Sequence, residues 1–437
     1  MTHARRITDA QVDRCRDTAV EFLKELVSTS RLGEMAVQAR VAAEARSIGC
    51  AVETIRYRPA SVPMVEEFAT DVAMGDVTRA CVVGRLPGTG GGRSLILFAH
   101  PDSEPLAETS SWRHDPFVGT VDGGRLYGWS VADDLAGVAT MVEALRAVLA
   151  GGLFPAGEVI LASTPSKRHG RGISALLHGG LNADAALYLH PAESGAGLRE
   201  VKAFASGQVE FRIVIEGRPP DTTEPLQTAF AHLAVNPIDK AISIYGALKA
   251  LDERRAAAVQ HPLLQEAVGR STNLMVSHIA AGNPAQLARS GATCVLGGAL
   301  SFPPPETLGE VQRQIEAAVW EVSESDPWLK EHPPRLLWDA GVTGAEVTSM
   351  HPLYRVVSDA IFAVSGEAPS LNPMHTSSDI RNPIVQKGIP TVGLGPLGGD
   401  LAQNGRTDEW VDIEDFVRGV KVTAGVIVGW CGVSRTG

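Results

Sequence analysis

Short apolar segments alternate with helical segments through the first half of this sequence. Four apolar segments are typical of strands buried on both faces: CVVGRL at 81–86, SLILFAH at 94–100, VILAST at 159–164 and DAALYLH at 184–190. Helical periodicity at 135–150 and 173–180 lies between them. This order predicts an α/β fold built on a mostly parallel mixed sheet that is flanked by helices.

The same alternation of helical and strand patterns occurs at both ends of the chain. Residues 7–50 have helical periodicity, residues 51–57 form a strand pattern, and residues 59–76 are irregular. After about residue 326 the pattern returns as a helix at 351–364, a strand at 389–395 and a closing helix from residue 413. We therefore expect the two ends to share one sheet.

The central part of the chain has a different pattern. Residues 208–217 (QVEFRIVIEG) alternate apolar and polar side chains, as a half-exposed antiparallel strand does. Helices at 237–251 and 305–319 and strands at 272–279 and 292–302 complete a β-α-β-β-α order. We expect a catalytic domain formed by residues 1–206 and 326–437, with an α+β domain inserted at 207–325.

Composition excludes several classes of function. At 437 residues the chain is too long for one ordinary core. The net charge of −11 argues against nucleic acid or an anionic membrane as a partner. Apolar runs fall short of the roughly 18 residues that a membrane span needs, and the N-terminal residues lack the apolar core of a signal peptide. Five scattered cysteines without a CxxC pair fit a reducing compartment, so we expect a cytoplasmic protein.

Candidate metal ligands lie at the boundaries of three predicted elements. His100 ends one strand, His190 ends another, and Asp133 lies just before the helix at 135–150. Two imidazoles and a carboxylate suit zinc, manganese or ferrous iron. The H-x-D spacing predicts that Asp102 accepts the proton on the other ring nitrogen of His100. The alternative for each histidine is a hydrogen-bonded structural residue, which is the commoner role of a histidine at a strand end.

Several segments, in the same order along the chain, resemble the M20 family of zinc amidohydrolases and carboxypeptidases. They are CVVGRLPGTGGGRSLILFAHPDSEP, DPFVGTVDGGRLYGWSVADDLAGVATMVEAL, VILASTPSKRHGRGISALL, DAALYLHPAESG, VNPIDKAISIYGAL and GLGPLGGDLAQNGRTDEWVDIEDF. The resemblance runs from about residue 80 to the C-terminus. It implies a zinc-exopeptidase-like fold whose inserted domain acts as a lid and dimerisation domain, and hence a homodimer.

The sequence departs from the family pattern at one of the two family metal sites. Where the family has a glutamate pair, whose first member is the general base and whose second binds metal, this chain has Lys167 and Arg168. The family's histidine near the C-terminus falls at Asn404, or at Gln403 if the register slips by one. Two cationic side chains would repel a divalent ion there.

All three protein ligands of the other family site have equivalents. The resemblance assigns them to His100, Asp133 and His190, and so predicts a single divalent ion, zinc or manganese, with open positions for water and substrate. His169 is an alternative ligand if the register of its segment shifts.

The resemblance implies hydrolysis of a C–N bond, an amide or an amine, in a small, carboxylate-bearing substrate. Because the usual base is missing, Glu104 and Glu193 are the candidates for that role, since both lie close to the predicted metal. Lys167 and Arg168 are expected to bind a substrate carboxylate or to stabilise developing negative charge. A solvated loop is the alternative for each of these four side chains.

Substrate contacts are expected from two further segments. The loop MHTSSDIRNP lies where family members contact substrate, and AFAHLAVNP lies in the inserted domain near the start of a lid helix. The residues predicted to bind substrate are His375, Ser378, Asp379, Arg381, His232 and Asn236. A structural turn with a capping Ser or Asp is the alternative for the loop, and His232 is a shifted counterpart of a family lid histidine that often acts from the partner subunit.

Two other functions stay open at this point. One branch of the family removes the amino group of a nitro-substituted aminobenzoate by attack of water on the ring carbon, which fits loss of the peptidase base. The other is a binding protein without catalysis on the same fold, which fits loss of a base and two ligands.

Overall fold

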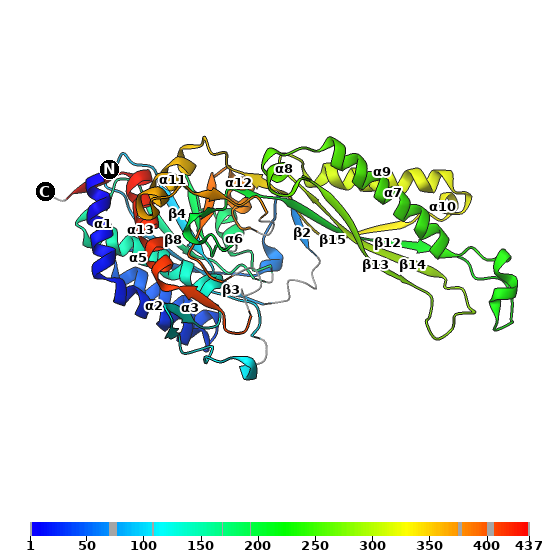
Figure 1. Ribbon diagram of the computed structural model, residues 1–437, viewed down its shortest axis with the longest axis horizontal. Helices are drawn as coiled ribbons and strands as arrows, with labels where there is room; N and C mark the ends of the chain where they lie inside the picture. Colours follow the sequence, from blue (N-terminus) through cyan, green and yellow to red (C-terminus); the bar gives the residue numbers. More distant parts are fainter. Residues whose placement is uncertain are drawn as a thin grey trace.

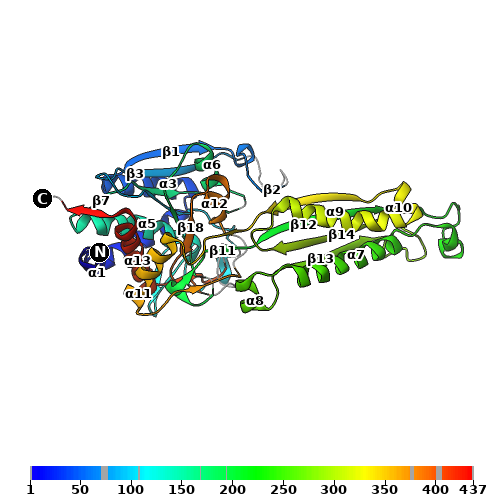
Figure 2. The ribbon, with the colours of Figure 1, turned by 90° about the horizontal axis from the view of Figure 1, so that it is seen from above.

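The computed structural model describes residues 2–69, 77–106, 109–167, 169–192, 194–374, 378–399 and 406–435. Two bodies lie side by side along its long axis, and each is built on its own β-sheet (Figure 1). The larger body contains both chain ends, which lie on the side away from the smaller body (Figures 1 and 2).

The larger sheet has six strands within the described residues. Their order is β1 (Ala51–Tyr57), β3 (Arg79–Leu86), β8 (Val159–Ser163), β4 (Leu95–Ala99), β9 (Ala186–Leu189) and β18 (Thr391–Leu394). The strands β8, β4, β9 and β18 run parallel to their neighbours in this group, whereas β3 is antiparallel to both β1 and β8. The predicted α/β class with a mixed, mostly parallel sheet is therefore confirmed. The glycine-rich segment at 87–92 connects β3 to β4, and β8 lies between these two strands in the sheet.

Helices cover both faces of the larger sheet because side chains alternate along each buried strand. On β4, Leu95, Leu97 and Ala99 pack into one core, and Ile96 and Phe98 pack into the other. The first core also contains side chains of α1 (Thr2–Arg14), α2 (Arg16–Ser30), α3 (Glu34–Ser47), α5 (Ala136–Ala150), α11 (Pro352–Ser365) and α13 (Ile413–Cys431). The second core lies beside α6 (Gly172–His178) and α12 (Arg381–Lys387).

The smaller sheet is antiparallel and has five strands within the described residues. Their order is β13 (Asn273–Ala281), β14 (Thr293–Phe302), β12 (Gly207–Glu216), β15 (Arg335–Val342) and β2 (Glu67–Ala69). On β12, Val209, Phe211, Ile213 and Ile215 point to a core that is shared with α7 (Pro237–Ala258), α9 (Leu308–Ser325) and α10 (Pro327–Glu331). The predicted pattern of an antiparallel sheet with helices on one face thus matches the structure.

Two strands of the smaller sheet come from outside residues 207–325. β15 follows that segment, and β2 lies within the stretch at 59–76 that we interpreted as irregular. β2 pairs with β15, with Glu67 opposite Val342. A strand of three residues is too short for its periodicity to be recognised, so its place depends on the partner strand.

Short elements complete the described chain. They are η1 (Pro59–Ser61), η2 (Thr109–Ser111), β5 (Thr120–Asp122), β6 (Arg125–Tyr127), η3 (Val131–Leu135), β7 (Leu153–Pro155), η4 (Gly197–Arg199), β10 (Glu200–Val201), β11 (Phe204–Ala205), η5 (Gln227–Leu233), α8 (Pro262–Val268), β16 (Ala345–Glu346), β17 (Ser370–Leu371), β19 (Trp410–Asp412) and β20 (Val433–Arg435). All the cysteines lie in the described residues and are unpaired. None of the described helices combines the length and the apolar character needed to cross a bilayer.

Candidate metal centre

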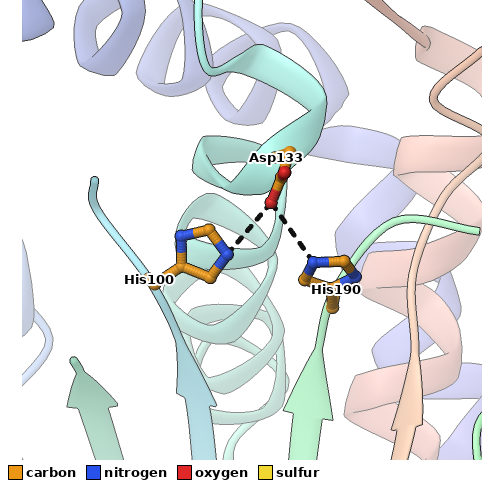
Figure 3. A group of neighbouring side chains, drawn as sticks. All are labelled: His100, Asp133 and His190. Carbon is orange, nitrogen blue, oxygen red and sulfur yellow. Dashed lines mark ion pairs between the residues drawn. The ribbon is translucent and has the colours of Figure 1, made fainter. Parts of the chain in front are cut away.

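Three of the predicted ligands meet at the carboxyl ends of neighbouring strands. His100 follows β4, His190 follows β9, and Asp133 lies in η3, the turn that leads into α5 (Figure 3). The Oδ1 atom of Asp133 lies 3.0 Å from Nε2 of His100 and 3.2 Å from Nε2 of His190. All three side chains are buried. Parallel strands β4 and β9 pair directly, which brings the two imidazoles to one edge of the sheet.

This arrangement suits a divalent cation. One ligand atom from each residue lies within 4.8 Å of the other two. Nε2 of His100 and Oδ1 of Asp133 are buried, and apart from the close approach of this carboxylate and the two imidazoles neither atom has a hydrogen-bond partner among the described residues. Such a state is costly, and a bound cation would relieve it. On the other side of the His100 ring, Nδ1 lies 2.8 Å from the carbonyl oxygen of Asp102. A proton on Nδ1 would leave the lone pair of Nε2 facing the centre.

The second carboxylate oxygen of Asp133 faces a lysine. Nζ of Lys167, which lies in the loop after β8, is 2.6 Å from Oδ2 of Asp133. Burial raises the pKa of Asp133, but Lys167 and the two imidazoles outweigh it and hold that pKa well below its ordinary value. The ammonium group therefore lies beside a charged carboxylate.

Asp102 holds the loop that carries Lys167. Its Oδ1 atom accepts a hydrogen bond from the backbone N–H of Ser166 at 2.9 Å, and Oδ2 accepts one from the backbone N–H of Lys167 at 2.8 Å. Arg79 of β3 donates to Oδ2 of Asp102 at 2.6 Å and to the carbonyl oxygen of Lys167 at 2.9 Å, and it also contacts Glu34 of α3. The carboxylate of Asp102 thus binds the loop. Nδ1 of His100 lies nearer to the backbone carbonyl oxygen of Asp102, at 2.8 Å, than to the carboxylate atom Oδ1, at 3.5 Å.

A buried carboxylate from the C-terminal part of the chain orders the turn around Asp133. Glu409 accepts hydrogen bonds from the backbone N–H groups of Ala132, Asp133 and Ser130 at 2.8, 3.0 and 3.2 Å. Burial raises its pKa to about 8. The motif GRTDEWVDI contains this residue, but no spacing within the sequence pairs it with Asp133.

His190 also has a charged neighbour that the sequence did not indicate. Nζ of the buried Lys202 lies 3.0 Å from Nδ1 of His190 and 3.8 Å from a carboxylate oxygen of Glu200, and it also contacts the carbonyl oxygen of Pro191. Lys202 therefore packs against the side of the imidazole that faces away from Asp133.

A cavity of about 460 Å³ opens beside the candidate centre, between the two sheets. Four residues predicted to act on substrate line it, namely Glu104, Lys167, Asp379 and Arg381, and so does the predicted metal ligand His190. His169 also lines it, although it does not join the three converging ligands. Ser378 is buried, and its carbonyl oxygen accepts a hydrogen bond from Arg381. Arg168, Glu193 and His375 lie outside the described residues.

The two predicted substrate-binding residues of the inserted domain lie elsewhere. His232 belongs to η5 and is exposed. The segment between β12 and α7, which contains η5, lies at the outer end of the smaller body (Figure 1). Asn236 caps α7, because its side-chain oxygen accepts a hydrogen bond from the backbone N–H of Ile238 at 3.1 Å. Within one chain, then, the segment that contains these two residues lies at the outer end of the smaller body (Figure 1).

Comparison with known proteins places these features in a family. The family model for the peptidase family M20/M25/M40 matches residues 96–428. The chain belongs to this family. The resemblance inferred from the sequence is therefore confirmed, and this M20 protein is a hydrolase of the type whose members depend on a divalent metal.

Curated relatives of the M20 protein cover most of its length. An N-formyl-4-amino-5-aminomethyl-2-methylpyrimidine deformylase from Halalkalibacterium halodurans is 24% identical over 78% of this chain and 79% of its own. A succinyl-diaminopimelate desuccinylase from Alkalilimnicola ehrlichii is 28% identical over 70% of this chain and 77% of its own.

Solved structures agree with the fold. An M20 family metallo-carboxypeptidase from Sulfolobus solfataricus superposes with a TM-score of 0.66 at 14% identity, covering 95% of this chain and 98% of that one. The aminopeptidase PepT from Bacillus cereus gives the same TM-score at 17% identity and the same coverage of both chains. At these identities the likeness concerns the fold alone.

Proposed function

We propose that this M20 protein hydrolyses a carbon–nitrogen bond of a small, carboxylate-bearing substrate with one divalent metal ion, zinc or manganese. The convergence of His100, Asp133 and His190, with ligand atoms within 4.8 Å of one another, carries the proposal. The names of the two curated relatives, a deformylase and a desuccinylase, both describe removal of an acyl group, which supports an amide as the bond cleaved.

Lys167 is the reason for proposing one ion rather than two. Its ammonium group lies 2.6 Å from Oδ2 of Asp133, so a positive charge already faces the second oxygen of the only carboxylate in the converging group. A second divalent ion beside that oxygen would be repelled by the ammonium. Lys167 thus takes over, within the chain, the charge that a second metal would bring.

The residues around the cavity suggest how the reaction runs. His100, Asp133 and His190 would hold a divalent ion, which would supply the Lewis acidity that makes water nucleophilic near neutral pH. Glu104 lines the cavity together with His190 and is exposed to it, so its carboxylate is our candidate to take the proton of the attacking water and to return it to the leaving nitrogen. Lys167 stabilises the negative charge that develops on the substrate oxygen.

The smaller body supports a homodimer as the working assembly. β13 is an edge strand, and α7 packs beside it. Large apolar side chains of both are exposed and line one hollow: Ile242 (60%), Tyr245 (44%) and Ile279 (60%). A second copy that pairs on this face would cover them. The outer end of one lid, with His232 and Asn236, is then proposed to reach the cavity of the partner.

The experiment that tests the reaction class starts with metal content. The full-length protein, purified without chelator, should contain about one zinc or manganese ion per chain. It should release carboxylate and amine from N-formyl or N-succinyl substrates, whereas release of ammonia from a nitro-aminobenzoate would make it a deaminase. Bound metal without either product would favour a binding protein, and absence of metal after loading would refute the proposed centre.

A further inference from the structure

Strand β2 lies beside the hinge between the two bodies. This hinge comprises residue 206, between β11 and β12, and residues 343 and 344, between β15 and β16. On one side of it β12 pairs with β15 in the smaller sheet, and on the other side β11 pairs with β16. Gln208 and Val342, which pair at the start of the smaller sheet, line the cavity. A change of angle at the hinge would therefore change the width of the cavity.

Backbone and side-chain contacts attach β2 to the smaller body. Its three residues pair with residues 340–342 of β15. The carbonyl oxygen of Glu66 accepts a hydrogen bond from the backbone N–H of Thr343 at 3.0 Å, and its carboxylate accepts one from the backbone N–H of Leu308, at the start of α9, at 3.3 Å. Phe68 packs against the core of the smaller body. The segment at 66–69 thus covers the end of β15 up to the hinge.

The side chain of Glu67 connects the same strand to the larger body. Side chains alternate along a strand, so Glu67 points away from the core that Phe68 contacts. Its Oε2 atom lies 3.3 Å from Nη2 of Arg381, at the start of α12, and Oε1 lies 3.8 Å from Nε of Arg171. The side chains of Glu67, Arg381 and Arg171 are only 10%, 14% and 7% exposed, so water does little to screen their charges. Glu67 is therefore a contact between the two bodies.

We propose that β2 is a brace for the hinge and that the ion pairs of Glu67 are the part of the brace that can be released. Backbone pairing fixes β2 to the strand that leads into the hinge, and Glu67 fixes β2 to the larger body. The hinge angle, and with it the width of the cavity, then depends on whether these ion pairs are intact. This role needs neither a metal ion nor a substrate, so it goes beyond the proposed function.

Amide hydrogen exchange, followed by mass spectrometry on the full-length protein, tests the brace. Glu67→Gln keeps the size of the side chain but removes its charge. Exchange in residues 335–343 should become about tenfold faster, the factor that corresponds to the loss of one hydrogen bond to a charged group. Exchange in β14, which lies on the other side of β12, should not change. Arg381→Met removes the partner in the larger body and should accelerate exchange in residues 335–343 in the same way.

Small-angle X-ray scattering measures whether the two bodies move apart. The radius of gyration should be larger in both variants than in the wild type, because the smaller body can swing further about the hinge.

Matched controls come from an ion pair that lies within the smaller sheet. Arg212 and Asp339 form a two-pronged pair at 2.6 and 2.7 Å between β12 and β15. Their side chains are 52% and 27% exposed, so the pair contributes little to stability. Asp339→Asn and Arg212→Met make the same changes of charge as the two test variants, and exchange and radius should stay at wild-type values.

Three results would overturn the brace. The first is wild-type exchange in residues 335–343 of a folded Glu67→Gln or Arg381→Met variant. The second is equal acceleration in β14, which would indicate general destabilisation. The third is faster exchange with an unchanged radius of gyration, which would indicate fraying of β2 alone. Thermal melting checks that each variant folds. Because no measurement depends on metal content or turnover, the brace and the proposed hydrolase can fail separately.

Discussion

Asp133 divides its carboxylate between two environments. Oδ1 faces the two imidazoles, and Oδ2 faces the ammonium group of Lys167. An ammonium group offers donors and no acceptor, so it serves as a counter-charge to Asp133 but cannot hold a metal ion. The same group lines the cavity, where a substrate oxygen can approach it. Lys167 therefore influences both the number of metal ions that the centre can hold and the stabilisation of charge on the substrate.

Replacing Lys167 should separate these two roles. In Lys167→Met we expect about one metal ion per chain and a fall in kcat/KM of about 10²- to 10³-fold, the usual cost of removing a group that stabilises an oxyanion. In Lys167→Glu we expect more than one metal ion per chain in excess zinc. The new carboxylate would take the place of the ammonium group beside Oδ2 of Asp133 and could help to hold a second ion. Elemental analysis and steady-state kinetics measure both.

The control for this pair of variants is Lys24→Met. Lys24 forms an ion pair with Glu21 on α2, a helix at the periphery of the larger body. The Lys24→Met substitution removes the same charge, and Lys24 does not line the cavity. A Lys167→Met enzyme with wild-type kcat/KM would exclude the oxyanion role, and two ions in the unaltered protein would exclude the single-metal centre.

Glu104 is the described candidate for the general base. Glu104→Gln keeps the size of the side chain but removes its ability to take a proton, so we expect kcat to fall about 10²- to 10⁴-fold with metal content unchanged. Glu53→Gln on the exposed side of β1 is the control. Full activity in Glu104→Gln together with a large loss in Glu193→Gln would move the role to Glu193.

Helix α7 begins with a local structure that also explains one predicted functional residue. Asn236 occupies the N-cap position, Pro237 follows at the first helical position, and the side chain of Asn236 accepts the backbone N–H of Ile238. Such a cap satisfies a donor that the helix itself cannot pair. Asn236 thus has a structural role in its own chain, whatever it contacts in a dimer.

Two substitutions distinguish the cap from a substrate contact. Asn236→Ala removes the cap and should lower the free energy of unfolding by about 1 kcal/mol, measured by urea denaturation. Asn236→Ser retains a capping oxygen and should restore most of that stability. If the serine variant is also fully active, Asn236 is a cap and no more; a stable serine variant with raised KM would support a contact from the amide.

At the scale of the whole molecule, the segment that contains η5 is far from the cavity of its own chain. The cavity lies between the two sheets, whereas the segment that contains η5 lies at the outer end of the smaller body (Figure 1). The exposed apolar face on α7 and β13 lies on the same body. We therefore expect His232 to act on substrate only when a second copy brings it to the cavity.

Mixing two inactive variants tests this arrangement. His100→Gln disables the centre and His232→Ala disables the lid tip, so each homodimer should have low activity. After subunit exchange, mixed dimers contain one intact combination of centre and lid, and part of the activity should return. Ile279→Asp should prevent both association, measured by sedimentation equilibrium, and the recovery.

If the mixture stays inactive although exchange is demonstrated by mass spectrometry, His232 does not act across the dimer. A wild-type protein that sediments as a monomer at all concentrations would exclude the dimer itself.

Local pattern was enough to find the residues that end strands. The apolar periods of β4 and β9 predicted the places of His100 and His190, and the motif around Asp133 marked the turn before α5, because strand ends and helix starts are set by neighbouring residues. The family pattern likewise indicated that Lys167 and Arg168 stand in place of the glutamate pair. Whether these residues bind metal stays a prediction, although the structure brings them together.

Contacts between distant segments depended on the fold. Arg79 meets Asp102, Lys202 meets His190, Glu409 meets the turn around Asp133, and Glu67 meets both Arg171 and Arg381. Each pair joins residues from separate elements that the packing of the sheets brings together. No spacing along the chain predicts these contacts. The charges that surround the centre and the cavity are therefore properties of the packed molecule, because burial and proximity, rather than residue type, decide how strongly they interact.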